Sequence, residues 1–241
     1  MTQPTIDTTG TAPQPGDKSL FARFVGILFT PRETFALVAA RPRWFGMLAL
    51  VLIVSAVATG GFMLTAVGQQ AWMDAAEKAA GAGGPQQAEA LQRMAPYMGY
   101  ATIAGILIVS PLIMLVTTGI LFVIFTVGMG GNATFKQAFA VVVYSQAVGL
   151  VGAALKLPLN YLTRSMTAST NLGVFFPMLD DTSFLARLAG MVDLFLVWWV
   201  VVLAIGFGVL YKRRTGPIAV TFFVLYALIA VAIAAFQAAR S

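Results

Sequence analysis

Five long apolar runs constrain the fold of this chain more than any other feature of its sequence. The run from Met191 to Leu210 is the clearest, because Asp193 is the only charged residue among its twenty. A helix of about twenty apolar residues is long enough to cross the hydrocarbon core of a bilayer. We therefore predict an all-α fold, namely a polytopic integral membrane helical bundle with five transmembrane helices. The predicted spans cover residues 44–67, 100–129, 135–157, 190–211 and 218–236.

The composition agrees with a membrane protein and excludes several kinds of function. Only 10% of the 241 residues are charged, against about 25% in a typical soluble domain. The net charge of +6 could indicate nucleic acid, but the basic residues flank apolar runs, which is typical of an anionic membrane surface as the partner. The chain has neither Cys nor His, so it lacks a thiolate nucleophile, the usual general base and the commonest metal ligand. We predict no enzyme activity, no cofactor and no metal site, with the lipid bilayer rather than nucleic acid as the partner.

The N-terminal region divides into two parts. Residues 1–17 are rich in Thr, Pro and Gly and are predicted to be a disordered tail. Residues 18–43 place apolar side chains at helical spacing. Thr30 is a suitable N-cap, Pro31 suits the first helical position, and Glu33 completes a capping box. We interpret this part as two short amphipathic helices that lie in the membrane interface; soluble helices that bind a partner are the alternative.

Two connecting segments carry recognisable local patterns. Residues 68–98 form a polar interval, predicted to be an extramembrane helical hairpin with a Gly-Pro break at 81–85. Thr134 and Gln137 form a second capping-box pattern at the start of the third span. The five-span membrane domain is predicted to extend over residues 44–236.

Small and aromatic residues within the spans are predicted to serve helix packing. Glycine lets two membrane helices approach closely. A proline should kink the second span, because it removes a helical hydrogen bond. Two adjacent tryptophans lie in the middle of the fourth span, too deep for an aromatic belt. The predicted packing residues are Gly60, Pro111, Gly149, Gly152, Trp198, Trp199 and Gly208.

Basic residues at the span ends predict the orientation. Lys and Arg are more frequent in cytoplasmic segments than in segments outside. The predicted interface anchors lie just before the first span or just after the fourth: Arg41, Arg43, Trp44, Lys212, Arg213 and Arg214. With five spans, this distribution predicts a cytoplasmic N-terminus and a periplasmic or extracellular C-terminus.

Four short motifs stand in a fixed order along residues 20–236. They are Phe29-Thr30-Pro31-Arg32-Glu33-Thr34-Phe35, Gly131-Asn132-Ala133-Thr134-Phe135-Lys136-Gln137, Val142-Val143-Tyr144-Ser145, and Asp193-Leu194-Phe195 with Trp198 or Trp199. In these motifs the chain resembles the Ypt-interacting-protein (Yip) domain family in its bacterial form. The resemblance implies an integral membrane protein with five spans and a cytosolic N-terminus, and we expect it in the bacterial inner membrane.

The association of eukaryotic Yip proteins with Rab GTPases does not carry over to this chain. Their acidic Asp-Leu-x-Gly-Pro element is absent before the first span. Their Gly-Tyr-x-x-x-Pro element survives only as Tyr144, because Val143 and Val148 replace its Gly and Pro. The resemblance therefore assigns no functional residues.

These features favour a non-enzymatic membrane scaffold that recruits partners or shapes the bilayer. An amphipathic N-terminal segment and small-residue helix faces suit contacts with lipid, with other membrane proteins or with further copies of the chain. An intramembrane enzyme is disfavoured, because no candidate nucleophile has a recognisable base at usable spacing.

Asp193 supports the alternative, a small transporter or channel, because ionisable groups within membranes are often functional. The competing interpretation is structural. Asp193 lies three residues into its apolar run, where a carboxylate at the outer interface near a helix start is stabilised. Arg187 lies within reach as a partner. Asp193 is accordingly the candidate functional polar residue.

Overall fold

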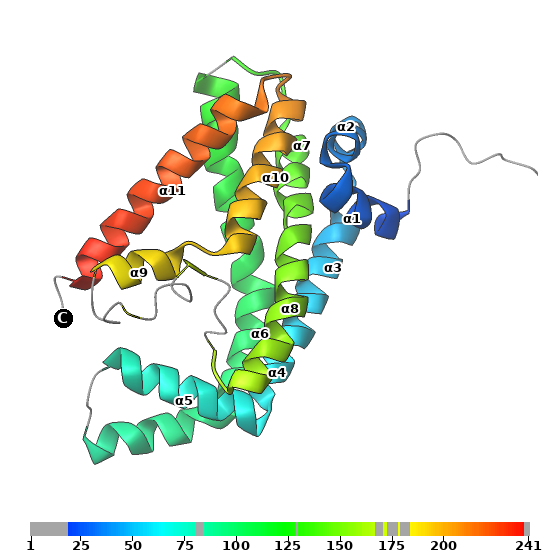
Figure 1. Ribbon diagram of the computed structural model, residues 1–241. Helices are drawn as coiled ribbons and strands as arrows, with labels where there is room; N and C mark the ends of the chain where they lie inside the picture. Colours follow the sequence, from blue (N-terminus) through cyan, green and yellow to red (C-terminus); the bar gives the residue numbers. More distant parts are fainter. Residues whose placement is uncertain are drawn as a thin grey trace, which may run out of the picture.

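Every helix or strand element assigned in the described part of the chain is a helix in the computed structural model, with no strand among them (Figure 1). The structure describes residues 19–80, 84–128, 130–166, 171–172, 178 and 184–238; the predicted tail at 1–17 lies outside them. Four helices are long and apolar enough to cross a membrane: Phe45–Leu64, Pro85–Gly128, Phe135–Thr163 and Thr215–Ile233. The all-α fold with several membrane-length helices is therefore confirmed. The predicted fourth span is represented by a shorter apolar helix of 17 residues, Leu194–Leu210.

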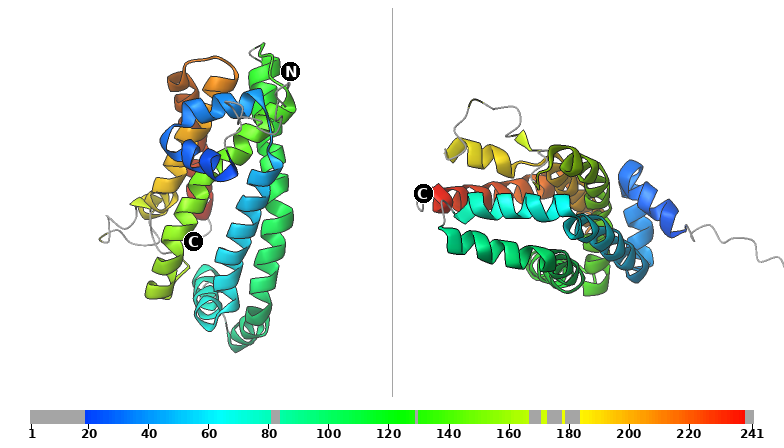
Figure 2. Two further views of the ribbon diagram at one scale, coloured as in Figure 1. Left: turned by 90° about the vertical axis from the view of Figure 1, so that its right-hand side faces the viewer. Right: turned by 90° about the horizontal axis from the view of Figure 1, so that it is seen from below.

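The N-terminal segment forms the two expected short helices, α1 (Leu20–Phe29) and α2 (Pro31–Ala40). They lie on one side of the bundle, towards its upper end (Figures 1 and 2). The buried side chains of the two helices join the main core, and Ile27, Phe35 and Val38 are fully buried there. Part of each apolar face thus contacts protein, a contact that the predicted interfacial helices did not include.

The capping box predicted at the start of α2 does not form. Pro31 occupies the first turn as expected, but the Thr30 side chain makes no capping hydrogen bond. Its hydroxyl instead donates to the Gly26 carbonyl at 3.4 Å. Because α1 ends directly at this residue, the Gly26 carbonyl accepts both the backbone N–H and the hydroxyl of Thr30, and the hydroxyl is not available to the amides of α2.

The first span is one apolar segment built of α3 (Phe45–Ser55), the π-helical turn η1 (Ala56–Gly60) and α4 (Gly61–Leu64). Gly60 is buried against α6 (Pro85–Phe122). A Cβ on Gly60 would overlap the side chain of Ile103, whereas a Cβ on the adjacent Gly61 would meet nothing within 4 Å. Close contact at Gly60 is what the small-residue pattern predicts.

Replacing Gly60 by leucine is expected to destabilise the fold by about 1–3 kcal/mol, since the added side chain forces α3–α4 away from α6. Gly61→Leu is the matched control, because a Cβ at Gly61 would meet no other atom within 4 Å. Thermal unfolding in mild detergent, followed by circular dichroism, should show a lowered midpoint for the first variant only. Equal shifts in the two variants would contradict the packing at Gly60.

The polar interval and the second span share one long helix. α5 (Ala66–Ala80) lies beside the first part of α6 at the lower end of the bundle (Figures 1 and 2). α6 then continues without a break into the π-helical turn η2 (Val123–Gly128). Pro96 and Pro111 both lie inside the helix. The second arm of the predicted hairpin is therefore the beginning of the second membrane helix, not a separate element.

The third span consists of α7 (Phe135–Ser145) and α8 (Ala147–Thr163), which meet at Gln146. Its capping box forms as predicted: the Gln137 amide N–H donates to Thr134 Oγ1, and the Thr134 N–H donates to Gln137 Oε1 at 2.8 Å. The helix passes through Pro158 and ends at Thr163, six residues beyond the expected end. The first residues after the predicted span therefore continue its helix.

Replacing Thr134 by alanine should cost about 1 kcal/mol, because the N-terminal amides of α7 lose their side-chain acceptor. Thr134→Ser is the matched control, since serine keeps the hydroxyl. In chemical denaturation in detergent, the free energy of unfolding of the serine variant should be close to that of the wild type, and that of the alanine variant should be lower. An alanine variant as stable as the serine variant would show that the box contributes nothing.

The last three helices are α9 (Phe184–Met191), α10 (Leu194–Leu210) and α11 (Thr215–Ala238). α10 packs against α2, α7, α8 and α11, so it lies at the centre of the bundle (Figure 1). The three largest fully buried side chains, Phe35, Tyr144 and Phe207, belong to α2, α7 and α10 and to one core cluster.

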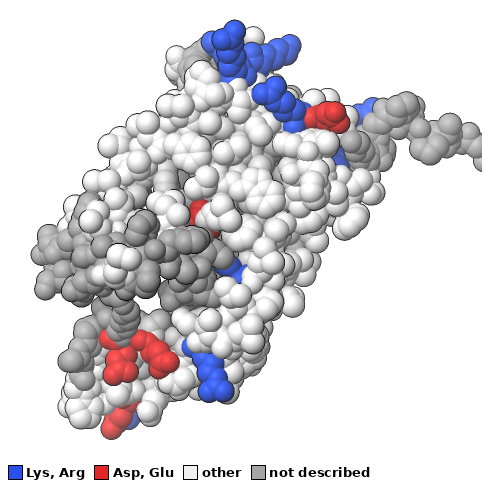
Figure 3. Space-filling view, in the orientation of Figure 1, with Lys and Arg blue, Asp and Glu red and all other residues white. Residues whose placement is uncertain are grey.

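Charged side chains gather mainly towards the two ends of the molecule, and the surface between them is mostly uncharged (Figure 3). The turn after α10 carries the exposed residues Lys212, Arg213 and Arg214, and the helices at the other end carry exposed Asp74 and Glu89. Exposed apolar side chains cover much of α6 and α11 between these ends. An apolar belt between two charged ends is the surface of a protein that is embedded in a bilayer.

Candidate functional site

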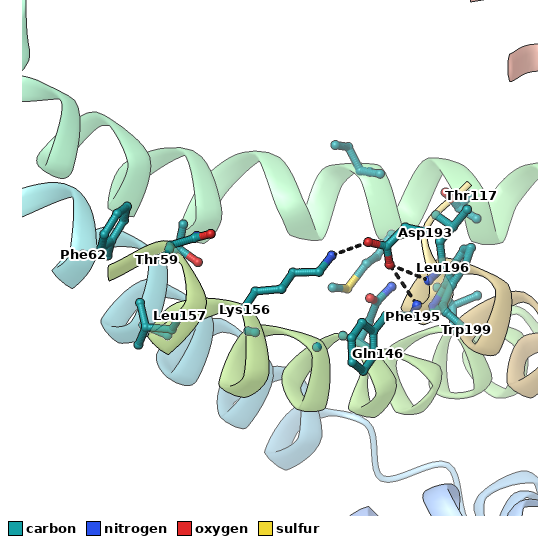
Figure 4. Close-up of a pocket in the computed structure, with 18 residues that line it drawn as sticks. Thr59, Phe62, Thr117, Gln146, Lys156, Leu157, Asp193, Phe195, Leu196 and Trp199 are labelled. Carbon is teal, nitrogen blue, oxygen red and sulfur yellow. Dashed lines mark hydrogen bonds and ion pairs between the residues drawn. The ribbon is translucent and has the colours of Figure 1, made fainter. Parts of the chain in front are cut away.

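A cavity of about 650 Å³ lies between the first, second and third spans and the beginning of α10 (Figure 4). Its wall is mostly apolar, with a few polar side chains among the lining residues. The polar and charged ones are Thr59, Thr117, Gln146, Lys156, Asn160 and Asp193, with the indole of Trp199 beside them. It is the site into which the structure places the candidate residue Asp193.

Asp193 is the N-cap of α10, not a residue within a transmembrane helix. α9 ends at Met191 and α10 begins at Leu194, so the apolar run is broken where a continuous helix was predicted. Asp193 Oδ1 accepts hydrogen bonds from the backbone N–H groups of Phe195 at 2.8 Å and Leu196 at 3.2 Å. A carboxylate in this position accepts hydrogen bonds from free amides and is stabilised by the positive end of the helix dipole.

The ionic partner of Asp193 is Lys156 of α8. The Lys156 Nζ atom donates to Asp193 Oδ2 at 2.7 Å and lies 5.6 Å from the centroid of the Phe195 ring (Figure 4). The two side chains are 35% and 21% exposed, respectively. The side chain of Arg187, the partner considered from sequence, lies outside the described residues.

The sequence contained a signal for this pair that the prediction did not use. Consecutive spans run in opposite directions, so the end of the third span and the beginning of the fourth lie on the same side of the membrane. Lys156 stands near the first of these ends and Asp193 near the second. Opposite charges in two such apolar runs are expected to pair, because an unpaired charge at that depth in the membrane is costly.

The backbone around Asp193 is held by a short bridge. Asn171 and Asp193 form an isolated antiparallel bridge, and the Leu172 N–H donates to the Val192 carbonyl at 2.9 Å. These contacts fix the extended link between α9 and α10, and thereby the position of the carboxylate.

Two further polar groups line the cavity deeper in the bundle, on Trp199 and Gln146. The Trp199 Nε1 atom is buried and has no acceptor within the described part of the chain. The Gln146 side chain lines the cavity at the junction of α7 and α8. A buried N–H without a partner is costly, most of all in a membrane.

The predicted packing residues have different surroundings. Gly152 faces the Phe195 ring, and Gly208 approaches the turn before α11, where its carbonyl accepts from the Arg213 N–H at 2.9 Å. Gly149 lines the cavity, and a Cβ there would meet only Gln146 Oε1, at 3.8 Å. Trp198 packs partly buried against the main core.

The predicted interface anchors lie at the upper end of the molecule. Trp44 is half-buried and makes an edge contact with the Phe139 ring, with 5.1 Å between the centroids. The five basic anchors are exposed: Arg41, Arg43, Lys212, Arg213 and Arg214.

A second polar cluster, missed from sequence, ties α1 to the bundle. Arg23 is 5% exposed, and its Nη1 donates to the Tyr144 hydroxyl at 3.4 Å. That hydroxyl donates in turn to the Arg43 carbonyl at 3.1 Å. Local sequence gives no indication of these contacts, because Arg23 and Tyr144 are 121 residues apart.

Membrane-length helices, an apolar belt and charged ends together define an integral membrane protein of the helical-bundle class. The Yip1 domain family matches residues 25–236, from the middle of α1 almost to the end of α11. The chain therefore belongs to the Yip1 domain family. No curated protein and no solved structure matches it significantly.

Proposed function

We propose that this Yip1-family protein is a non-enzymatic membrane scaffold that recruits partners or shapes the bilayer, and that its working surface is the outer face of α1–α2. The observation that supports this surface is a contrast in burial. Ile27, Phe35 and Val38 anchor the two helices in the core, while Phe21 and Phe29 are 73% and 79% exposed. Large aromatic side chains held rigidly on a surface are typical of a contact site.

Both forms of scaffold use this surface. Two extra helices at one end of the bundle widen its cross-section on that side (Figure 2). Insertion of the exposed rings among lipids would press one leaflet apart, whereas their burial by another protein would recruit it. The neighbouring exposed arginines, Arg32 and Arg41, suit an anionic lipid surface or an acidic partner.

Our proposed topology has five crossings, with α10 as the fourth. Its 17 residues rise about 25 Å, and the nineteen steps from Asp193 to Lys212 rise about 28 Å, close to the hydrocarbon thickness. The basic turn after α10 and the arginines before α3 support a cytoplasmic N-terminus in a bacterial inner membrane. Fusions at the C-terminus test this: alkaline phosphatase should be active and GFP dark. The opposite pair of results would overturn the orientation.

The alternative of a transporter is supported less well by the site. Both carboxylate oxygens of Asp193 already have partners, one in the α10 amides and one in Lys156. A carboxylate that caps a helix and pairs with a lysine has a structural role, and passing a cation through the site would require it to release these partners.

The scaffold proposal is tested by crosslinking in native membranes and by reconstitution into liposomes. The wild type should give specific partner or homo-oligomer crosslinks, or should change vesicle diameter. Phe21→Gln combined with Phe29→Gln should abolish the effect. Met94→Gln with Tyr97→Gln is the control, because these residues are also exposed but lie near the opposite end. An uncrosslinked monomer that conducts solute across liposomes would overturn the proposal.

A further inference from the structure

We propose that the cavity beside Lys156 and Asp193 binds one zwitterionic phospholipid, with the headgroup at the ion pair and an acyl chain along the apolar wall. This binding site is separate from the surface of α1–α2 and does not depend on the scaffold role. Its volume, about 650 Å³, lies within the range of about 300–1,000 Å³ that is usual for ligand sites.

The charges of the site are complementary to a zwitterion. The cavity presents one ammonium, on Lys156, and one carboxylate, on Asp193. A headgroup with one phosphate and one ammonium can lie antiparallel to this pair, with its phosphate at Lys156 and its ammonium at Asp193. An anionic lipid would also bring its phosphate near Asp193, but its headgroup has no ammonium to pair with that carboxylate. The site should therefore discriminate against anionic lipids.

The depth of the Lys156–Asp193 pair in the bilayer agrees with that of a lipid headgroup. Lys136 and Lys156 are twenty residues apart along α7 and α8, which corresponds to about 30 Å, the thickness of the hydrocarbon core. Lys156 therefore lies near the edge of this layer opposite to Lys136. From there the cavity extends along α8 to Gln146, ten residues or about 15 Å further into the bilayer.

The other lining residues suit the acyl chain and the ester groups of a lipid. Phe62, Ile113, Met114, Val142, Leu157 and Leu196 supply an apolar wall suited to an acyl chain. The unpaired indole N–H of Trp199 is a buried donor at the same cavity, and Gln146 offers an amide. The ester carbonyls of a glycerophospholipid are acceptors that would satisfy such donors, which removes the penalty of leaving them unpaired.

Lipid retention by the purified full-length protein tests this site. The protein is equilibrated in detergent with equimolar phosphatidylethanolamine and phosphatidylglycerol, and bound lipid is counted by native mass spectrometry. The wild type should retain one phosphatidylethanolamine in preference to phosphatidylglycerol. Gly149→Leu should lower this retention by about tenfold or more, because the new side chain enters the cavity without a backbone clash. Gly119→Leu is the control, since its surroundings are open and it does not line the cavity.

A second variant separates the headgroup from the chain. Lys156→Met combined with Asp193→Asn removes both charges and keeps a polar cap on α10. It should still retain lipid but lose the preference for phosphatidylethanolamine. Gel filtration and thermal unfolding verify that each variant is folded. The proposal is overturned if the folded wild type retains no lipid or retains both lipids equally, or if Gly149→Leu retains as much as the wild type.

Discussion

Replacing Phe35 by alanine is expected to destabilise the protein by about 3–5 kcal/mol, the usual cost of removing a buried aromatic side chain. Phe35 is fully buried between α2 and the central helices, and its ring would be 3.0 Å from a Cβ on Gly206 of α10. Its loss leaves a cavity in the main core. The measurement is the free energy of unfolding in mixed micelles, by titration with a denaturing detergent.

Phe29→Ala is the matched control for this variant, because the Phe29 ring is 79% exposed at the end of α1. It should change the free energy of unfolding by no more than about 0.5 kcal/mol. The comparison also separates two arrangements of the N-terminal helices. If α2 only rested on the membrane surface, both variants would be nearly neutral, and the docking of α2 into the core would be refuted.

Replacing Asp193 by alanine is expected to cost about 2–4 kcal/mol, between the values for exposed and fully buried ion pairs. The variant removes the cap of α10 and leaves the Lys156 ammonium without its partner. Asp193→Asn should cost less, because asparagine still caps the helix. Adding Lys156→Met to Asp193→Asn should recover part of the loss, since no unpaired charge then remains.

The same set of variants distinguishes a structural carboxylate from a transport residue. Unfolding in detergent gives the stability of the wild type and of each variant, and solute or proton flux in liposomes gives the activity. A structural role predicts the order wild type, double variant, asparagine variant, alanine variant, with no flux in any of them. Flux that the wild type carries and the stable asparagine variant loses would instead assign Asp193 to transport.

Much of the helical architecture is predictable from the sequence, because the bilayer sets the length of every apolar segment. The four long helices begin or end within a few residues of the predicted spans in most places. The capping box at Thr134 was also predictable, since it depends only on residues three positions apart. The continuity of α6 was not, because proline lowers helix propensity locally while neighbouring helices can compensate for the lost hydrogen bond.

The docking of α2 illustrates what hydropathy cannot decide. The spacing of Phe35 and Val38 is the same whether that face meets lipid or protein, and lipid tails are as apolar as a protein core. Only contacts with α7 and α10, which lie far along the chain from α2, distinguish the two environments. Asp193 is a different case: its residue type is a common N-cap, so the break before α10 was legible in the sequence, but the apolar residues on both sides masked it.

The continuous helix from Pro85 to Gly128 has a mechanical consequence. Its 44 residues form a strut about 66 Å long. One end lies beside α5, and at the other the Phe125 ring stacks 5.3 Å from the Tyr211 ring, whose hydroxyl is 2.8 Å from that of Thr126. A tilt imposed on the hairpin at one face of the bilayer would therefore shift the basic turn at the other face, because the same helix connects the two.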